Sequence, residues 1–328
     1  MKVFVTGATG QLGYDVMIEL LRRGHEAIGS GGRDLKAFVP GATGQLGRDC
    51  IRNHAAIGSD IAEKYGGATT AAPYVRLDIT DKVAVASVIE DMRPDAIIHC
   101  AAWTDVDGAE NPENKLLAHK INAEGTENIA KAAKSVDAKM VYISTDYVFN
   151  GQGTEPWTPD CEDYAPLNYY GQTKLEGERA VAHLLEKYFI VRIAWVFGLN
   201  GKNFIKTMIH IGKTHDTVRV VNDQIGTPTY APDLARLLAD MIETEKYGRY
   251  HATNEGGYIS WYDLCVESYK QYGLSATVIP VTTEEYGLSI ATRPFNSKLD
   301  KSKLIRSGFT PLPDWRDAVK RYLTEAEL

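Results

Sequence analysis

The sequence of 328 residues contains only four cysteines, and none of them stands in a C-x-x-C pair. They are Cys50, Cys100, Cys161 and Cys265. Their wide spacing indicates neither a zinc knuckle nor a disulfide framework. No cluster of carboxylates suited to a metal stands out either. We therefore predict no metal site and a protein of the reducing cytoplasm.

The chain also lacks a long apolar run and an excess of positive charge. The apolar stretch over residues 1–7 is too short for a signal peptide or a membrane span, and it is more typical of a buried strand. Lys and Arg total 36 against 43 Asp and Glu, which gives a net charge of -7. This balance argues against a nucleic-acid or anionic-membrane surface. We predict neither as a partner.

With 44% hydrophobic residues, the chain can bury a large core. Short apolar runs alternate with helical patterns along its first two thirds. The predicted strands are residues 2–6, 96–100, 140–144 and 188–196, and the predicted helices are residues 11–23, 113–134 and 173–186. This alternation is typical of βαβ units in a parallel sheet covered on both faces. The predicted fold class is α/β, with a doubly wound, Rossmann-like parallel sheet.

After about residue 200 the alternation loosens. Short strands at residues 218–221 and 276–280 stand among helices at 231–243, 261–272 and 315–325. We predict a dinucleotide-binding Rossmann domain over residues 1–200, completed by parts of 225–260. The remaining residues, 201–328, are expected to form a smaller α+β substrate-binding lobe.

The heptapeptide GATGQLG occurs twice, at residues 7–13 and again at 41–47. Residues 31–59 therefore contain a shortened second copy of the first βαβ unit. Two copies at one end of a chain do not make a repeat architecture, so a local duplication or an engineered insertion is the better explanation. Copy two carries Pro40 where copy one has Thr6. We favour copy one as the builder of the cofactor site.

The glycine turn of copy one follows a predicted strand and opens a predicted helix, as in dinucleotide-binding folds. Gly7, Gly10 and Gly13 permit a tight turn, a close approach to a pyrophosphate and close packing of the helix on the strand. The amides of Gln11 and Leu12 lie at the predicted helix N-terminus, which faces the anion. These five residues are the predicted pyrophosphate site.

The choice between NADPH and NADH stays open in the sequence. A carboxylate after the second strand bonds a free ribose 2'-hydroxyl and repels a 2'-phosphate. If copy one supplies that strand, Arg33 follows it and favours NADPH. If copy two supplies it, Asp60 follows and favours NADH.

Tyr170 and Lys174 form a Tyr-x-x-x-Lys pair, which shares one face of a helix. An ammonium about 4 Å from a phenol would lower the pKa of that phenol by up to about three units, before desolvation subtracts from the effect. Thr145 ends the predicted strand 140–144, where it could place a hydroxyl beside the phenol. These three residues are the predicted catalytic group.

The glycine turn with Thr145, Tyr170 and Lys174 resembles the extended short-chain dehydrogenase/reductase superfamily. Finer motifs resemble the dTDP-4-dehydrorhamnose reductase family. They are residues 100–107 (CAAWTDVD), 142–149 (YISTDYVF), 166–171 (PLNYYG), 222–229 (NDQIGTPT) and 291–297 (ATRPFNS). Apart from residues 31–59, the likeness extends from Lys2 to the C-terminal helix.

The resemblance implies reduction of the C4 keto group of a dTDP-4-dehydro sugar to dTDP-L-rhamnose, with NADPH or NADH as the hydride source. It assigns Tyr170 as proton donor, Thr145 as hydrogen-bond partner of the same oxygen, and Lys174 to the nicotinamide ribose and the tyrosine pKa. It also implies two further sets of residues and a possible homodimer. Asp78, Ile79, Ala101 and Ala102 would contact the cofactor, and Thr104, Asp146, Trp195 and Arg293 would contact the substrate.

Two other functions remain open at this stage. A nucleotide-sugar epimerase or dehydratase would share the catalytic group but would regenerate its bound NAD. A non-catalytic regulatory subunit would bind nucleotide and a partner enzyme, although it would have no chemical need for Thr145, Tyr170 and Lys174.

Overall fold

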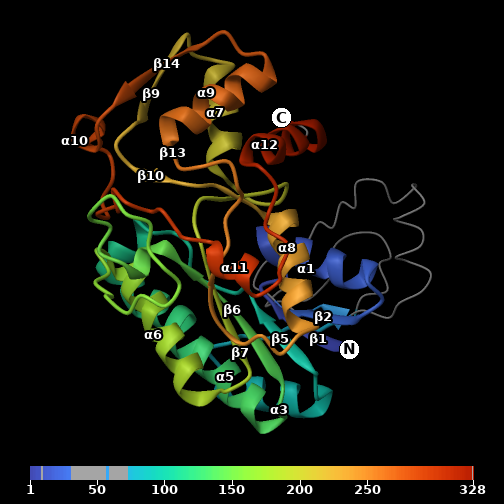
Figure 1. Ribbon diagram of the computed structural model, residues 1–328. Helices are drawn as coiled ribbons and strands as arrows, with labels where there is room; N and C mark the ends of the chain where they lie inside the picture. The colour runs from blue at the N-terminus through green and yellow to red at the C-terminus, as the bar shows by residue number, and fades with distance from the viewer. Residues whose placement is uncertain (9, 31–56, 59–72, 327) are drawn as a thin grey trace.

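The computed structural model describes residues 1–8, 10–30, 57–58, 73–326 and 328 (Figure 1). Copy one of the duplicated unit lies within these ranges. The glycine turn of copy two at residues 41–47 lies outside them, as do Arg33 and Asp60.

A parallel sheet forms the centre of the molecule. Its strands run in the order β12-β7-β6-β5-β1-β2-β3-β4, and every pairing within it is parallel. The strands are β1 (Lys2–Thr6), β2 (Glu26–Ser30), β3 (Ile57–Gly58), β4 (Pro73–Tyr74), β5 (Ala96–His99), β6 (Lys139–Thr145), β7 (Tyr188–Ile193) and β12 (Gly248–His251). The predicted doubly wound parallel sheet is confirmed.

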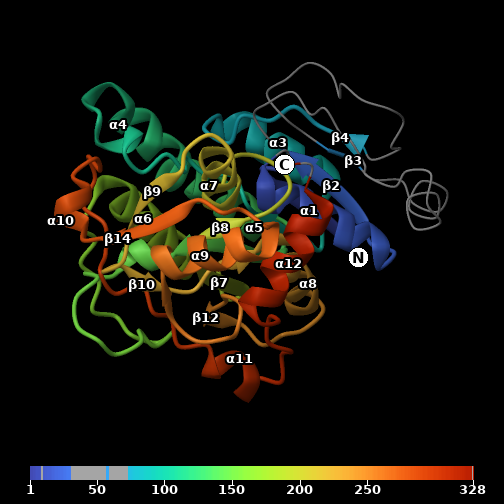
Figure 2. The same ribbon diagram turned by 90° about the horizontal axis from the view of Figure 1, so that it is seen from above.

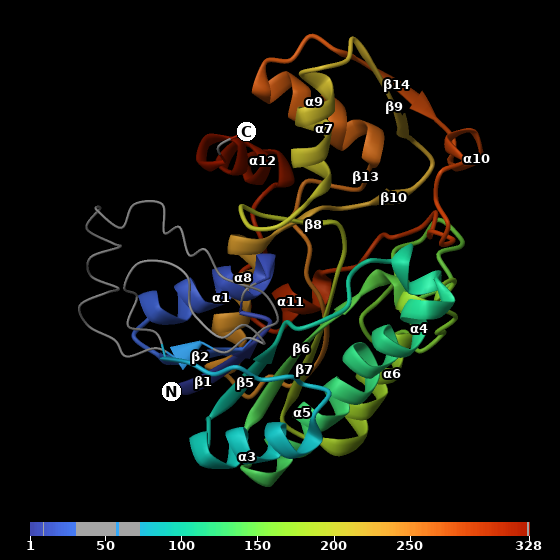
Figure 3. The same ribbon diagram turned by 180° about the vertical axis from the view of Figure 1, so that it is seen from behind.

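Helices cover both faces of this sheet (Figures 1 and 3). One face packs against α1 (Gln11–Arg22) and α8 (Ala231–Ile242). The other packs against α3 (Lys82–Met92), α5 (Thr126–Ser135) and α6 (Tyr169–Leu184). Successive strand residues point to opposite faces, so in β6 Val141 joins the first core and Met140 the second. Burial on both faces explains why these strands read as continuous apolar runs.

The helix predicted over residues 113–134 is divided into three parts. It consists of α4 (Pro112–His119), a π-helical segment η2 (Lys120–Gly125) and α5. The π-helical turn carries the fully buried Asn122, whose side chain bonds Trp103 and Thr173 instead of facing solvent. Such wider turns occur often at functional sites.

Two other predicted boundaries differ from the structure. Helix α6 begins at Tyr169 instead of Thr173, because the Asn168 side chain caps it by accepting from the Gly171 amide. The strand predicted over residues 188–196 ends at Ile193, because Trp195 takes a left-handed backbone conformation with φ 51°.

The C-terminal part of the chain forms further small sheets and a third core above the main sheet (Figures 1 and 2). Strand β12 returns from this region to the edge of the main sheet beside β7. The remaining elements are η1 (Gly108–Glu110), η3 (Asp146–Val148), β8 (Val196–Phe197), α7 (Phe204–Gly212), β9 (Thr217–Val221), β10 (Ile225–Gly226), β11 (Thr229–Tyr230), β13 (Ile259–Ser260), α9 (Trp261–Tyr272), β14 (Thr277–Val281), α10 (Thr283–Tyr286), α11 (Ser302–Arg306) and α12 (Trp315–Glu325).

Copy one of the duplicated unit supplies β1, α1 and β2, and β1 lies between β5 and β2 in the sheet. A fragment of copy two, Ile57–Gly58, pairs with β2 as β3, so that Ile57 lies opposite its duplicate Ile28.

Among the described residues, none of the helices has the length and apolar composition needed to cross a membrane.

Helix α8 contributes to the core beneath the sheet although it lies far from the N-terminal half in sequence, and Leu238 on it is fully buried. Leu238→Ala should lower the free energy of unfolding by about 2–5 kcal/mol, because it removes buried methyl groups and leaves a cavity. Urea denaturation measures this loss. The control Leu116→Ala, at a leucine 64% exposed on α4, should stay within about 0.5 kcal/mol of the parent. Equal effects at the two positions would contradict this role of α8.

Candidate functional site

The order of the strands reverses between β1 and β5, and in such sheets ligands bind outside the carboxyl ends of the strands at that point. Gly7 lies there with φ 67°, and a Cβ on it would come within 2.6 Å of the Ala101 amide nitrogen. Glycine is therefore required by both conformation and space. A Cβ on Gly13 would collide with the Gly7 carbonyl, so helix α1 packs directly on the turn.

The end of helix α1 above this turn fits a pyrophosphate. Gly10 is the N-cap and supplies no side-chain cap, so the first amides of the helix are not satisfied by a cap side chain. The first turn of α1 carries no acidic residue. Helix amides and an unopposed dipole favour an anion here. The turn thus has the space and the donors that a dinucleotide needs.

A buried chain of hydrogen bonds fixes the two loops that form this crevice. The Ala101 amide donates to the Thr6 hydroxyl, which contacts His99 Nδ1, and His99 Nε2 contacts the Thr126 hydroxyl at 3.0 Å. Thr126 donates onward to the Asn122 carbonyl. This sequence of partners assigns the proton of His99 to Nε2. Burial, followed by the charge of Lys174, lowers the pKa of His99 to about 3, so the ring is neutral.

Thr145 and Asp146 at the end of β6 meet Tyr170 and Lys174 on α6. The Thr145 hydroxyl donates to Asp146 Oδ1 at 2.9 Å, and it lies near enough to the Tyr170 phenol to lower the pKa of that phenol. Lys174 Nζ donates to the Ile143 carbonyl at 2.7 Å. The structure thus places the three predicted catalytic residues at the end of β6 and on the first part of α6, next to β5 and two strands from β1 and its Gly7 turn.

The electrostatics of this group differ from the sequence expectation. Burial, followed by the negative charge of Asp146, raises the pKa of Tyr170 above its usual value, and the Thr145 hydrogen bond only partly opposes this. Burial lowers the pKa of Lys174 to about 7, against the charge of Glu178. The expected lowering of the Tyr170 pKa by Lys174 is therefore not present in this state. The phenol therefore holds its proton firmly, and burial disfavours the charged form of Lys174.

The Asp146 carboxylate next to the phenol has one oxygen that accepts no hydrogen bond from the described residues. The side chain is 2% exposed, and its Oδ2 has no hydrogen-bond partner among the described residues. Burial raises the pKa of Asp146 to about 6, although the nearby Ser297 and Thr145 hydroxyls oppose the shift. A buried acceptor without a donor is costly, and it is suited to a hydroxyl of a bound ligand.

A buried ion pair lies behind the catalytic group. Arg192 of β7 binds Glu178 of α6 with both Nε and Nη2, at 2.8 and 2.7 Å, and both side chains are at most 2% exposed. Glu178 also accepts from the Ser144 hydroxyl. Strands β6 and β7 and helix α6 are thereby fixed to one another immediately behind Thr145.

The predicted substrate residues lie on separate segments around this end of the sheet. Trp195 stacks on Trp261 with ring centroids 3.9 Å apart, and its left-handed backbone turns the chain there. Thr104 is exposed on the loop after β5. Arg293 forms an ion pair with Asp107 at 2.7 Å, so its guanidinium already has a carboxylate partner.

The other predicted cofactor residues differ from one another in burial and in their hydrogen bonds. Asp78 is exposed, and it accepts from the backbone and hydroxyl of Thr80 within its own turn. Ile79 and Leu12 are buried in the cores, whereas the buried Oε1 of Gln11 has no hydrogen-bond partner within the described ranges. Ala102 is half-buried beside Ala101.

Three residues that contribute to the site were not predicted, namely Asp107, Asn122 and Glu178. Helical spacing could have indicated Glu178, because it lies four residues after Lys174 and eight after Tyr170. Asp107 ends the motif of residues 100–107, but its partner Arg293 is 186 residues away. No sequence signal marks Asn122, whose side chain is turned inward by the π-helical segment.

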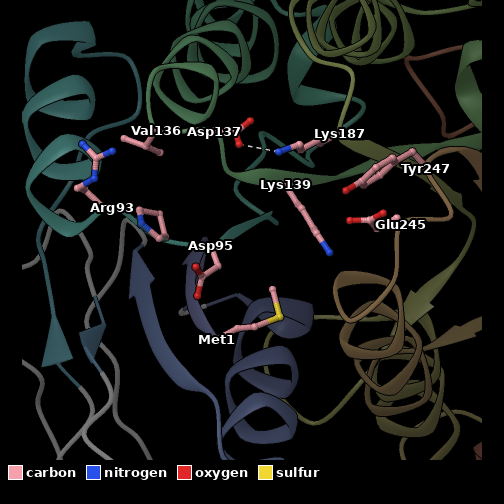
Figure 4. A pocket seen from close by; sticks show the side chains of 10 residues that line it. Met1, Arg93, Asp95, Val136, Asp137, Lys139, Lys187, Glu245 and Tyr247 are labelled. Atoms are coloured by element: carbon pink, nitrogen blue, oxygen red, sulfur yellow. Dashed lines mark hydrogen bonds and ion pairs between the residues drawn. The ribbon is translucent and has the colours of Figure 1, made fainter.

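A hollow of about 680 Å³ lies at the opposite end of the strands, where β5, β6 and β7 begin (Figure 4). It is lined by Asp95, Lys139 and Lys187, near the amino ends of β5, β6 and β7, among other residues. Lys187 is paired with Asp137 at 2.6 Å, and Lys139 donates to two carbonyls at the C-terminal end of α8, those of Ile242 and Thr244. This hollow therefore offers neither the catalytic group nor a free pair of cations.

Within the described ranges, no group of three His, Cys, Asp or Glu residues could hold a metal.

Comparison with known proteins gives the same family at several levels. The family model described as "RmlD substrate binding domain" matches residues 1–328. A dTDP-4-dehydrorhamnose reductase of Streptomyces griseus is 40% identical over 265 residues, which are 79% of this chain and 86% of that relative.

Solved structures of similar proteins match over nearly the whole chain. The crystal structure of a dTDP-4-dehydrorhamnose reductase from Clostridium acetobutylicum is 40% identical, with a TM-score of 0.81 over 99% of both chains. A structure of the Bacillus anthracis dTDP-4-dehydrorhamnose reductase in complex with NADP is 36% identical, with a TM-score of 0.79 over 99% of both chains.

The raised pKa of Asp146 should make the protein less stable as the pH rises. Between pH 3.8 and about 6 the folded state keeps a proton that the unfolded state releases, so the cost is fully present above pH 6. Asp146→Asn removes this cost, and it should raise the free energy of unfolding by about 1–3 kcal/mol at pH 7.5 and by less at pH 5. Urea denaturation at the two pH values measures the gain.

The control for Asp146→Asn is Asp105→Asn, because Asp105 is an exposed carboxylate that accepts only within its own turn. It should change stability little at either pH. A loss of stability in Asp146→Asn at pH 7.5 would contradict the cost assigned to the buried charge.

Proposed function

The chain belongs to the RmlD substrate-binding-domain family, which agrees with its resemblance to dTDP-4-dehydrorhamnose reductases, and we propose that it reduces the C4 keto group of dTDP-4-dehydro-L-rhamnose to give dTDP-L-rhamnose. The observation that carries this proposal is the position of Thr145, Tyr170 and Lys174 at the carboxyl end of β6, which is the same end of the parallel sheet as the Gly7 turn. A hydroxyl, a phenol and an amine at the mouth of a dinucleotide site are the groups that carbonyl reduction needs.

The crevice supports NADPH or NADH as the cofactor. The Gly7 turn, the start of α1 without a side-chain cap, and the backbone of Ala101 and Ala102 would hold the pyrophosphate and the rest of the dinucleotide, with Asp78 and Ile79 on the adenine side. When bound, the reduced nicotinamide supplies the hydride to C4. The choice between the two cofactors depends on Arg33 and Asp60, and it stays open.

Tyr170 is the proposed proton donor. Its raised pKa keeps the phenol protonated in the resting state, so a proton is available for the alkoxide that develops at the C4 oxygen. Thr145 would donate a hydrogen bond to the same oxygen, which requires its hydroxyl to turn away from Asp146. Lys174 would hold the nicotinamide ribose, and its positive charge would ease release of the proton from Tyr170.

We assign the substrate to the surface between the loop after β5 and the C-terminal region. Asp146 Oδ2 is buried and accepts no hydrogen bond from the part of the chain that the structure describes, so it fits a sugar hydroxyl. Thr104 and Trp195 would line the sugar pocket. Arg293 would meet the diphosphate, since a guanidinium binds phosphate oxygens in pairs.

Three broader proposals accompany this function. Residues 1–200 with parts of 225–260 would form the dinucleotide-binding domain, and residues 201–328 the substrate-binding lobe, with the return of β12 to the main sheet in support. A homodimer remains a prediction. We also propose a cytoplasmic location, on the wide spacing of the cysteines.

The direct test is oxidation of NADPH or NADH by the purified protein, with and without dTDP-4-dehydro-L-rhamnose. Oxidation that depends on the sugar and consumes cofactor in proportion to product supports the reductase. Turnover without net cofactor consumption would favour an epimerase or dehydratase. A folded protein that binds dinucleotide but turns over no sugar would favour a regulatory subunit.

Tyr170→Phe should reduce turnover by about 10²- to 10⁴-fold, because it removes the proton donor and little volume. Cofactor affinity, measured by calorimetry, should be nearly unchanged. Tyr169→Phe is the matched control: the neighbouring Tyr169 ring contacts Lys115 instead of Thr145. Similar turnover in the two variants would exclude Tyr170 as the donor.

Gly10→Val should abolish dinucleotide binding if copy one is the working turn. A Cβ at Gly10 would already lie 3.2 Å from the Gly7 carbonyl, and the branched side chain would project in front of the helix amides. The equivalent change in copy two, Gly44→Val, should then leave binding unaffected. Calorimetric titration with NADPH of both variants decides between the copies, and the opposite pattern would assign the cofactor to copy two.

A further inference from the structure

Asp107 is the most heavily bonded carboxylate of the loop that follows β5. Its Oδ1 accepts from the backbone amides of Ile290 and Ala291, at 3.1 and 2.8 Å. Arg293 adds a fork, with Nη1 on Oδ1 at 3.0 Å and Nη2 on Oδ2 at 2.7 Å. One side chain thus holds a segment that lies more than 180 residues later in the chain.

The segment held by Asp107, residues 290–293, follows α10 and leads toward α11 (Figure 1). It is bound next to the catalytic helix as well, because the Asn168 cap of α6 donates to the Thr292 carbonyl at 2.8 Å. Tyr147 lies between this segment and the start of α6. Its ring packs edge-on against the Tyr170 ring, with centroids 5.7 Å apart, and the charges of Arg293 and Asp107 lower and raise the pKa of Tyr147, respectively. The Asp107–Arg293 pair therefore lies beside the catalytic group.

The ion pair uses only part of the guanidinium. Arginine has five N–H donors. Nη1 is used by Asp107 and by the Ala291 carbonyl, and Nη2 gives one donor to Asp107. Among the described residues, neither Nε nor the second Nη2 hydrogen has a hydrogen-bond partner. These two form the side fork of the guanidinium, which matches two oxygens of one phosphate.

The carboxylate that holds Arg293 is ionised at neutral pH. Burial alone would raise the pKa of Asp107, but the hydrogen bonds from Arg293, Ala291 and Ile290 outweigh it and lower the pKa below its usual value. Both side chains are partly accessible, 34% for Asp107 and 23% for Arg293. A charged ligand can therefore reach Arg293 while Asp107 keeps its hold.

We propose that Asp107 is a positioning residue for substrate binding: it fixes Arg293 through the end of the guanidinium, so that the side fork of Nε and Nη2 faces the diphosphate of the nucleotide sugar. This inference rests on the proposed function, and it adds a residue that acts on the substrate only through Arg293. Holding a long side chain in one orientation reduces the entropy lost on binding.

Asp107→Asn keeps the shape and the backbone contacts but loses the charge and the paired fork. The KM for the nucleotide sugar and the inhibition constant of dTDP should both rise by about tenfold, while kcat and the KM for the cofactor stay within about twofold. Asp105→Asn is the matched control, with the same charge loss two residues away on the same loop. An effect no larger than in this control overturns the proposal.

A double-mutant cycle separates positioning from a general effect of charge. If Asp107 acts through Arg293, Asp107→Asn should add little to Arg293→Gln, because the group it positions is already gone. Full additivity of the two changes overturns the proposal. A lower KM in Asp107→Asn also overturns it, since Asp107 would then compete with the diphosphate for Arg293.

Two further measurements keep the test decisive. If Asp107→Asn fails to fold, Arg293→Lys serves instead, because it retains the positive charge and lacks the side fork. The inhibition constant of dTDP for this variant should rise by about the same factor. An unchanged constant overturns the proposal. If the wild-type protein reduces no sugar, the proposed function fails. Calorimetric titration of the same variants with dTDP then still tests Asp107 by itself.

Discussion

The backbone of Gly7 lies against the backbone of Ala101 with no room for a side chain between them, and the rest of the site depends on this approach. It aligns the ends of β1 and β5, which flank the point where the strand order reverses. The buried chain through Thr6, His99 and Thr126 keeps both loops in place, and it continues through Asn122 toward α6. The cofactor crevice and the catalytic helix are therefore parts of one hydrogen-bonded framework.

The catalytic group is held in an electrostatically unfavourable state. Burial shifts the pKa values of Lys174 and Asp146 toward their neutral forms, to about 7 and about 6. Both side chains are almost fully buried, so the cost arises from water removed around them. The Glu178–Arg192 pair directly behind them is tightly bonded and anchors the strands on which they depend. Sites that are arranged for ligands commonly carry such a cost in stability.

The two sides of the site are built differently. The proposed catalytic residues come from β6 and α6, which are near in sequence and fixed by regular structure. The substrate side joins the loop after β5 to residues 290–293, and Asp107 is its main connection. Contacts on loops allow one fold to serve many substrates, and they are also the part of the site that sequence patterns describe least well.

The sequence by itself determined the parallel sheet and the local motifs on which the proposed catalytic chemistry depends. Gly7 to Gly13 and the Tyr170–Lys174 pair are local patterns, because a turn and a helix face are set by residues a few positions apart. The motif likeness also gave the family correctly. Helix α9 and helix α12 were predicted with their observed bounds, since an amphipathic period and a terminal cap are likewise local.

Only the tertiary structure decided the pKa values, the burial and the distant contacts of these residues. Burial and the charge of Asp146 raise the pKa of Tyr170, and the lowering expected from Lys174 is not present. The π-helical turn at Asn122, the left-handed backbone of Trp195 and the pairing of Arg293 with Asp107 all arise from segments far apart in the chain. Local periodicity contains no information about which distant groups meet or how much water they exclude, and those two quantities set charge and orientation in the site.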